Sequence, residues 1–352
     1  MPRIPDARFP LPEKPITTHS VVDLLGGVVH KRPPTGEEAL AHLNRLESLA
    51  RHGNLDARVE LAYHHLHNAG QQSNTNRTIM RLVRPAAEAE HVEGMYLMGL
   101  LMLRGQGCPQ NLEDGARLIE KAAFQGHLEA QKLLARLYTQ GWGRDQNQSQ
   151  ALYWYRLAAG QDDQEALRET GLYYLYGIGC PADEQKGAGY LERAARLGDS
   201  FAQYELYKYF RKQPTDEDKA QAQFWLNESA LAGDLDAQFR QGLQCWSGQG
   251  GKSVNLREAL RWTCRAAEGG NIQAVTTLAG FFVAGNILPV NLNSAYMLAL
   301  FAERQGNATA QMTRQSLESM LTYRAKRRCI SSLKHFSEVK PLVEALIPRD
   351  QR

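Results

Sequence analysis

The sequence predicts an all-α protein in which pairs of antiparallel helices repeat along the chain and stack into a solenoid. Three observations predict this fold. A residue suited to a helix-to-helix turn recurs eight times, at intervals of 35 to 37 residues. The same face of small and apolar residues follows each of these turns. A Gly-x-Gly phrase, or a substitute for it, then separates the first helix of most repeats from the second. A constant period of this length is typical of repeat architectures.

The turns between repeats are mostly centred on glycine. Glycine is the usual residue just after a helix, where the chain closes the last turn in a left-handed conformation. The eight turn centres are Gly53, Glu90, Gly126, Asp162, Gly198, Gly233, Gly270 and Gly306. Two of them, Glu90 and Asp162, are not glycine, and we expect those two turns to close in a different way.

The first helix of each repeat begins with a small residue four positions after the turn, which we count as position 0 of the repeat. These residues are Ala57, Gly94, Ala130, Ala166, Ala202, Ala237, Ala274 and Ala310. Positions 0, 4, 5 and 8 share one face of a helix with 3.6 residues per turn. Position 5 is small in most repeats, as at Gly99, Ala135, Gly171 and Gly242. Because a mid-helix glycine costs about 1 kcal/mol relative to alanine, we expect another backbone to approach closely there.

The second helix follows a short turn and starts at a polar residue. Gly-x-Gly occupies this turn at 105–107, 141–143, 177–179 and 248–250, whereas RKQPTD replaces it at 211–216. Asn and Asp are favoured N-caps because their side chains accept a hydrogen bond from a free backbone N–H. The expected helix starts lie near Asn111, Asn147, Asp183, Asp218, Asn255 and Asn291. Each second helix is rich in aromatic residues and most end in Ala-Ala or Ser-Ala.

The phrase LLARLYTQGWG from Leu133 to Gly143, followed by SQALYWYRLAA from Ser149 to Ala159, resembles the Sel1-like repeat. This α/α family is related to the tetratricopeptide repeats, and the similarity extends over residues 37–315. The resemblance implies a right-handed superhelical solenoid of seven to eight helix-turn-helix repeats. It also implies a non-enzymatic scaffold or adaptor for protein–protein interaction. Family members assemble complexes, often in bacterial envelope, secretion or signalling systems and in eukaryotic degradation.

The two ends of the chain differ from the repeats, and we divide it into three parts. Residues 1–34 form a proline-rich extension, 35–315 the repeat solenoid, and 316–352 a C-terminal helical cap. For the extension two interpretations stay open. It is either a loose tail with a short docked piece at 21–29, or a segment that covers the end of the stack or lies in its groove. The basic cluster of the cap is either the solvated face of a helix or a contact for an acidic partner, nucleic acid or an anionic surface. It consists of Arg324, Lys326, Arg327 and Arg328.

Composition favours a folded cytoplasmic protein. The net charge of +3 creates no global field that would attract nucleic acid. The longest apolar stretch near the start, residues 21–29, is far shorter than the roughly 20 residues that span a bilayer. Five cysteines stand at scattered positions without a CxxC pair, which favours a reducing compartment. We therefore expect no membrane span, a cytoplasmic location and a monomer.

No catalytic or metal-binding constellation emerges from the sequence. The Gly-x-Gly turns join two helices, whereas a dinucleotide loop must follow a strand. His64 and His67 share a helical face, but no Cys, Asp or Glu joins them at ligand spacing. We expect neither a metal nor a small-molecule cofactor. The alternative function is a β-lactam-interacting hydrolase, suggested by Ser331-x-x-Lys334 and by activities linked to cysteine-rich members of the family. The Ser-Asp-Asn and Lys-Thr-Gly elements of such enzymes are missing, as are the regular cysteine pairs.

The candidate binding residues lie on the first helices, which line the concave surface in related solenoids. Position 8 is expected in the core. At position 7, Tyr173, Tyr209 and Phe281, with Lys208 and Arg240 nearby, are candidates for a groove wall that holds a protein or peptide segment. Tyr and Arg are common anchors of protein interfaces. The alternative is that the aromatics at position 7 only widen the core between repeats. Trp142 and Trp246, at or near turns, are further candidates for exposed contacts.

Overall fold

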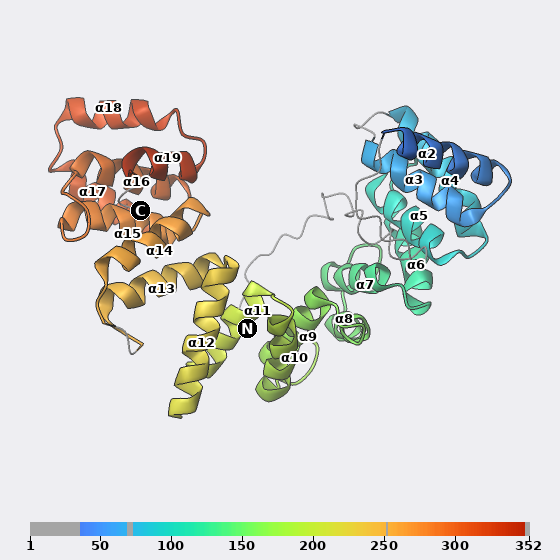
Figure 1. Ribbon diagram of the computed structural model, residues 1–352, viewed down its shortest axis with the longest axis horizontal. Coiled ribbons are helices and arrows are strands. Elements are labelled where there is room, and N and C mark those ends of the chain that lie inside the picture. Colours follow the sequence, from blue (N-terminus) through green and yellow to red (C-terminus); the bar gives the residue numbers. More distant parts are fainter. Residues whose placement is uncertain (1–35, 69–72, 251–252, 349–352) are drawn as a thin grey trace. The chain divides into compact units, whose positions relative to one another are not determined.

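A computed structural model describes residues 36–68, 73–250 and 253–348 (Figure 1). Within these ranges the chain forms eighteen α-helices and no strand, which confirms the all-α prediction. The chain divides into two compact units, Met1–Ala182 and Asp183–Arg352, which we call unit 1 and unit 2 and describe separately. The expected docked piece at 21–29 lies outside the described residues, and the division into extension, solenoid and cap remains a prediction.

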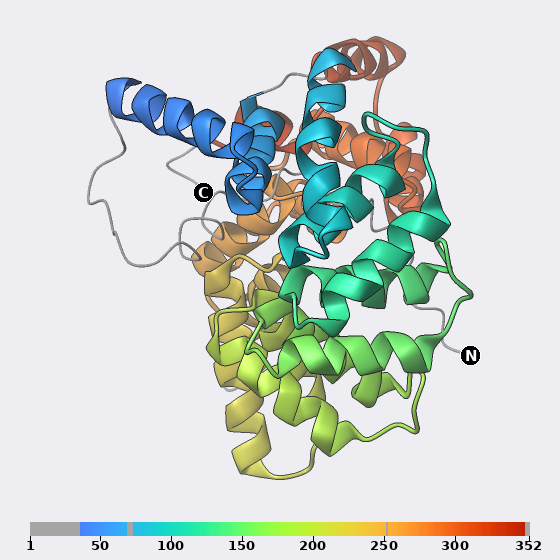
Figure 2. The ribbon, with the colours of Figure 1, turned by 90° about the vertical axis from the view of Figure 1, so that its right-hand side faces the viewer.

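Unit 1 consists of helices joined by short turns, with neighbours antiparallel (Figure 2). A leading helix α2 is followed by first helices α3, α5, α7 and α9 that alternate with second helices α4, α6 and α8. The bounds are α2 Gly36–Arg51, α3 Leu55–Asn68, α4 Ser73–Glu88, α5 Val92–Arg104, α6 Leu112–Phe124, α7 Leu128–Gln140, α8 Gln148–Ala159 and α9 Gln164–Tyr176.

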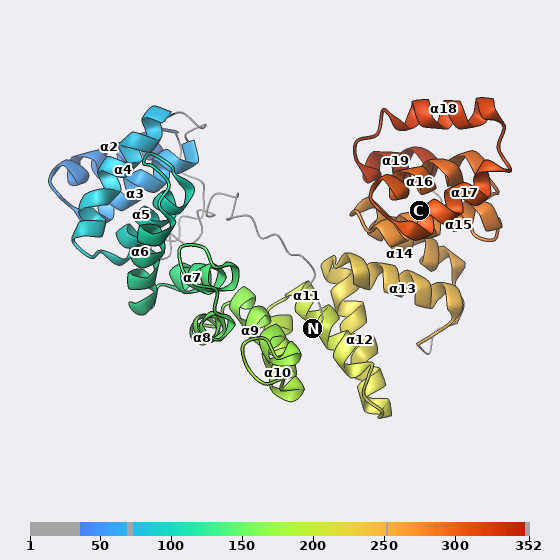
Figure 3. The ribbon, with the colours of Figure 1, turned by 180° about the vertical axis from the view of Figure 1, so that it is seen from behind.

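Unit 2 continues the pairing with first helices α11, α13, α15 and α17. The helices are α10 Glu184–Arg196, α11 Ser200–Phe210, α12 Asp216–Ala232, α13 Leu235–Ser247, α14 Leu256–Glu268, α15 Ile272–Ala284, α16 Leu292–Arg304, α17 Ala308–Glu318, α18 Tyr323–Leu333 and α19 Val339–Leu346. The last two leave the repeat pattern: α18 packs on α16, and α19 packs on α14 and α16 (Figure 3). Leu333, Leu342 and Val343 are buried in this end of the core.

All eight predicted turn centres adopt the left-handed conformation. The six glycines have φ between 85° and 106°, and Glu90 and Asp162 have φ of 56° and 57°. Our expectation that these two turns close differently is therefore wrong. A left-handed residue with a Cβ costs about 1–2 kcal/mol, so the geometry of the turn prevails over the preference of these residues. The backbone N–H groups of Glu90 and His91 donate to the carbonyls of Ala87 and Ala86.

The second glycine of each Gly-x-Gly turn in unit 1 is a contact between consecutive repeats. A Cβ on Gly143 would lie 2.1 Å from the carbonyl oxygen of Leu112, at the start of the preceding second helix. The equivalent distance at Gly107 is 2.4 Å, to the carbonyl oxygen of Asn76. Since these atoms belong to the backbone, no side-chain movement can make room. The turn phrase therefore has a structural role in stacking the repeats.

The small residues at position 5 allow the close approach that the sequence predicts. A Cβ on Gly99 would lie 2.9 Å from the carbonyl oxygen of Gly115 on the second helix of the same repeat. A Cβ on Gly242 would lie 2.7 Å from the hydroxyl of Thr263. Leu134 and Ala135, at positions 4 and 5, are fully buried. The core of each unit thus runs between its first and second helices.

The N-caps of the second helices agree with the prediction at five of six positions. Asn111, Asn147, Asp183, Asn255 and Asn291 each accept from a backbone N–H three residues later. Asp218 is the exception, because α12 starts earlier with Thr215 as its N-cap. There the Thr215 hydroxyl accepts from the N–H of Asp218, and the Asp218 carboxylate accepts from the N–H of Thr215. None of the helices in the described ranges is long and apolar enough to cross a membrane.

Candidate binding site

Two of the predicted groove residues are part of the core. Tyr173 and Phe281 are only 5% and 4% exposed. The Tyr173 hydroxyl lies 2.8 Å from that of Thr139 and donates to Gln148 at 2.9 Å. Burial raises the pKa of Tyr173 to about 12. These two side chains therefore correspond to the packing alternative that we left open, and they offer little surface to a partner.

Helix geometry explains why position 7 was the wrong row for a groove wall. At 100° per residue, position 7 returns to within about 20° of position 0, which faces the core. The opposite face of the first helix carries positions −1, 2, 3, 6, 9 and 10. We call this surface the first-helix face. Lys208 and Arg240, at positions 6 and 3, lie on it and are half-buried. Tyr209 is also half-buried, although it occupies position 7.

The two tryptophan candidates differ. Trp246, at position 9 of α13, is 43% exposed, and its ring centre lies 6.1 Å from that of Phe281. Trp142 is half-buried within the Gly141–Gly143 turn, where its backbone N–H donates to the carbonyl of Leu137. Trp246 is therefore the more accessible of the two.

The first-helix face of unit 1 pairs its own charges. The ammonium of Lys132 lies 2.7 Å from Glu129, 3.1 Å from Asp163 and 3.5 Å from Glu165. Arg136 also pairs with Glu165. Burial opposes the ionised form of Glu165, but Arg136 and Lys132 outweigh it and lower the pKa of this carboxyl. Cations and carboxylates from neighbouring repeats thus satisfy one another.

Sequence reasoning missed the residues at the N-terminal ends of the first helices. His91 and His127 are N-caps whose Nδ1 atoms accept from the N–H groups of Gly94 and Ala130, at 3.2 and 3.0 Å. The other ring nitrogen of His127 donates to Glu93 at 2.7 Å, and the Tyr63 hydroxyl donates to the same carboxylate. The available signal was a polar residue three positions before position 0. It recurs as Asn54, Asp163, Asp199, Asp234, Asn271 and Asn307.

The first-helix face of unit 2 leaves cations without carboxylate partners. Lys208 pairs with Glu205. No ion pair of Arg211, Lys212 or Arg240 occurs with any residue in the described part of the chain. The nitrogen of Lys208 lies 5.4 Å from the centre of the Tyr204 ring, and the guanidinium of Arg211 lies 5.5 Å from that of Tyr207. We call Lys208, Arg211, Lys212 and Arg240 the basic strip.

An apolar surface adjoins the basic strip on α13 and α15. It consists of Trp246 and Val283 at position 9, both exposed, with half-buried Leu243 at position 6. Gly280 occupies position 6 of α15, and a Cβ there would meet no atom within 4 Å. The missing side chain leaves room beside Trp246 and Val283. We call Trp246, Val283, Leu243 and Gly280 the Trp246 edge.

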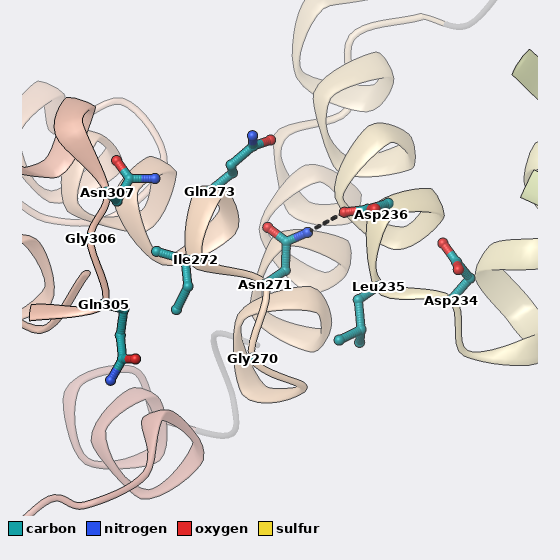
Figure 4. A pocket seen from close by; sticks show the side chains of 10 residues that line it. All are labelled: Asp234, Leu235, Asp236, Gly270, Asn271, Ile272, Gln273, Gln305, Gly306 and Asn307. Atoms are coloured by element: carbon teal, nitrogen blue, oxygen red, sulfur yellow. Dashed lines mark hydrogen bonds between the residues drawn. The ribbon is translucent and has the colours of Figure 1, made fainter. Parts of the chain in front are cut away.

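A pocket of about 590 Å³ lies at the N-terminal ends of α13, α15 and α17 (Figure 4). Asp234, Asn271 and Asn307 line it, and each caps its own helix by accepting from a backbone N–H at 2.8 to 2.9 Å. Asp236 accepts from the side chain of Asn271 at 2.8 Å. Burial raises the pKa of Asp234, and the nearby charge of Asp236 adds to this effect. These polar groups hold helix ends together.

Residues 92–127, 128–163, 164–199, 201–234 and 235–271 each match the family model described as Sel1 repeat. These stretches cover just over half of the chain. The chain belongs to the Sel1 repeat family. The matched repeats coincide with the pairs from α5–α6 to α13–α14.

One solved structure agrees with this assignment. The chain is similar to a Sel1 repeat protein from Oxalobacter formigenes, with 26% identity and a TM-score of 0.58 over 65% of this chain and 92% of that one. It also matches immunity protein Pa5087 from Pseudomonas aeruginosa, at 20% identity over 66% of this chain and 82% of that one. The TM-score for that pair is 0.36. A comparison with curated proteins finds no match.

The motifs that suggested hydrolysis or metal binding, Ser331-x-x-Lys334 and the histidine pair, do not belong to the first-helix face of this Sel1 chain. Ser331 and Lys334 are both exposed at the end of α18. His64 is exposed as well, whereas the side chain of His67 lies outside the described residues. Over the ranges that the structure describes, no group of three or more His, Cys, Asp or Glu side chains could hold a metal ion.

The ion-paired face predicts how the stability of this Sel1 chain depends on pH. The folded pKa of Glu165 is lowered, so its stabilisation is present above the unfolded value near 4.5 and is lost as pH falls through the folded value. Burial raises the pKa of Glu169, so its contribution is present below the unfolded value and is lost as pH rises through the folded one. Thermal unfolding measured across pH should therefore show two effects. Glu165→Gln should reduce the loss of stability as pH falls, and Glu169→Gln should reduce the loss of stability as pH rises. Unchanged pH profiles in both variants would contradict this assignment.

Proposed function

We propose that this Sel1 repeat chain is a non-enzymatic scaffold that binds a segment of a partner protein on the first-helix face of unit 2. A Sel1 solenoid is consistent with a protein-interaction scaffold, because stacked repeats present extended surfaces. The observation that carries the proposal is the basic strip, whose Arg240 lacks a carboxylate partner, beside the exposed ring of Trp246. Arg, Tyr and Trp supply most of the anchors in protein interfaces.

The contrast with unit 1 supports this choice of face. There, Lys132 and Arg136 already contact carboxylates from their own and the next repeat. A partner would have to replace these ion pairs before it could bind, and it would gain little. In unit 2, a partner can contact Arg240 and Trp246 without breaking an ion pair of either residue.

The same proposal includes the absence of catalysis, a cytoplasmic location and a monomeric state. The exposure of both Ser331 and Lys334 supports a non-enzymatic role, because acylating enzymes enclose their serine in a shaped site. Five cysteines at scattered positions, with no CxxC pair, support a reducing compartment. Incubation with a chromogenic β-lactam tests the hydrolase alternative, and a covalent adduct on Ser331 would revive it.

A second candidate function is contact between α18 and an anionic surface. Residues 323–340 contain six Lys and Arg against one Glu. Arg324, Arg327 and Arg328 are exposed, and none of the three forms an ion pair with a described side chain. Lys326 instead donates to the carbonyl of Glu318 at 3.2 Å. Binding of this kind must weaken as salt rises.

Affinity purification from native cell extract tests the main proposal. The variant Arg211→Ala/Arg240→Ala/Trp246→Ala should lose a protein that the unaltered chain retains, because none of these three side chains forms an ion pair with a described buried carboxylate. Tyr173 is left in place because it is buried. The control is Lys219→Ala/Phe224→Ala on α12 of the same unit, whose side chains are exposed. Circular dichroism establishes that both variants fold. Retention of the same proteins by the triple variant would show that the partner binds elsewhere.

A further inference from the structure

Resting on the proposed binding face, we infer that the segment held by unit 2 is an extended acidic peptide with a large apolar residue beyond its acidic end. The acidic residues contact the basic strip, and the apolar residue contacts the Trp246 edge. The inference concerns the chemistry of the partner, which membership of the Sel1 repeat family leaves open.

The preference for an acidic partner follows from a change of residue at position −1 of the repeat. In unit 1, position −1 supplies the carboxylate that pairs with cations of the preceding repeat, as Glu165 does for Lys132 and Arg136. In unit 2, this position is Gln273 on α15, in the repeat that follows Arg240 of α13. Asp236 on α13 retains the acid, but its carboxylate accepts from Asn271. Lys208 pairs with Glu205, but Arg211, Lys212 and Arg240 form no ion pair with a described carboxylate, so an acidic partner is complementary to these three cations.

Aromatic rings hold the cations of the basic strip in place. Tyr204 and Tyr207 stack with ring centres 5.6 Å apart, and Lys208 and Arg211 lie over their faces. Such cation–π contacts restrict long side chains before a ligand arrives. Binding then orders fewer rotamers and costs less entropy. Burial and the charge of Asp236 raise the pKa of Tyr204 to about 12, and the charge of Arg240 opposes this rise, so charged side chains of α13 lie near this ring of α11.

The arrangement of the two surfaces sets the order and length of the peptide. Three residues of the basic strip lie at the C-terminal end of α11 or just after it, whereas the Trp246 edge lies on α13 and α15. Packed helix axes lie about 8–10 Å apart, so three neighbouring first helices span about 20 Å. Extended chain covers about 3.3–3.6 Å per residue, so about six residues reach across. A nucleic acid would satisfy the cations but would leave the aliphatic side chains of Leu243 and Val283 without an apolar partner.

Selection of random peptides displayed against the full-length chain tests the inference. We expect the selected sequences to carry two or more Asp or Glu residues, followed about six positions later by an aromatic residue or leucine. Arg240→Glu should weaken their binding by about tenfold, because reversal of a contacting charge adds repulsion. The matched control is Arg196→Glu, an exposed charge reversal on α10 of the same unit, which should change binding by less than about twofold. Trp246→Ala should also weaken binding, and higher salt should reduce the effect of Arg240→Glu.

The outcomes separate the inference from the function on which it rests. Selected peptides without acidic residues, or equal effects of Arg240→Glu and Arg196→Glu, would overturn the acidic partner while leaving a peptide-binding face. Failure to select any peptide that depends on Arg240 or Trp246 would instead refute the proposed face. Labelled single-stranded DNA serves as the competing probe. Tighter binding of this DNA than of the best peptide, with loss in Arg240→Glu, would make the ligand a nucleic acid and overturn the inference.

Discussion

Replacement of Gly143 by alanine is expected to lower the free energy of unfolding by about 3 kcal/mol or more. The added Cβ would lie 2.1 Å from the carbonyl oxygen of Leu112 and 2.5 Å from its carbonyl carbon. Overpacking of a tight contact costs about 1–3 kcal/mol. The left-handed backbone at this residue, with φ of 68°, adds about 1–2 kcal/mol for any residue with a Cβ. Denaturant unfolding followed by circular dichroism measures the sum.

Gly126→Ala is the matched control for this variant. Gly126 is also left-handed, with φ of 87°, but a Cβ there would meet no atom within 4 Å. Its substitution should therefore cost only the backbone contribution of about 1–2 kcal/mol. The difference between the two variants isolates the contact between Gly143 and the preceding repeat. Equal losses would show that this contact does not hold consecutive repeats together.

The repeat fold could be predicted from sequence because its signals are local and recur at one spacing. A glycine at a turn or an alanine at position 0 is informative only as a member of a series. The series was strong enough that Glu90 and Asp162 occupy the same left-handed geometry as the glycines around them. Our error there was to weigh the residue type above the period. The start of α12 was misplaced for a related reason, because Thr215 and Asp218 are both good capping residues. Only the structure shows that Thr215 is the N-cap and that Asp218 completes the capping box.

The candidate site was harder to predict because it depends on which face of a first helix is left uncovered. The angular arithmetic that places Lys208 and Arg240 on the open face was available from the sequence. The aromatic character of Tyr173 and Phe281 led instead to position 7, which is buried in both repeats. Side-chain chemistry suggested a binding role, whereas the helical period favoured packing. For these two residues, the period was the better guide.

Charge pairing between repeats could be predicted only in part. Lys132 and Asp163 are 31 residues apart, and Arg136 and Glu165 are 29 residues apart. An acid roughly one period after a cation is therefore a usable signal, and its loss at Gln273 is visible in the sequence. The sequence does not give the geometry of the contact. Asp236 is an acidic residue at position −1, and yet its carboxylate accepts a hydrogen bond from the side chain of Asn271, which no spacing rule predicts.

Replacement of Lys132 by methionine is expected to lower the free energy of unfolding by about 3 kcal/mol. Its side chain is 9% exposed and contacts carboxylates of two repeats. Removal of one partner from a buried ion pair costs about 3–5 kcal/mol, because the remaining charges are left uncompensated. Here Glu129, Asp163 and Glu165 would face one another with Arg136 as the nearby cation that remains paired to Glu165. Partial exposure of Glu129 reduces the cost, which places the estimate at the low end of that range.

Lys121→Met provides the comparison, because Lys121 also pairs with a carboxylate, Glu90, but its side chain is 53% exposed. An exposed pair contributes about 0–1 kcal/mol, so this variant should unfold close to the unaltered chain. The double variant Lys132→Met/Glu165→Gln should recover part of the summed loss of the two single variants, since both single variants remove the same contact between Lys132 and Glu165. Full additivity of the two substitutions in thermal unfolding would mean that Lys132 and Glu165 do not interact. Recovery would instead establish that the two repeats are coupled through this buried ammonium, as the distances between its nitrogen and the three carboxylates require.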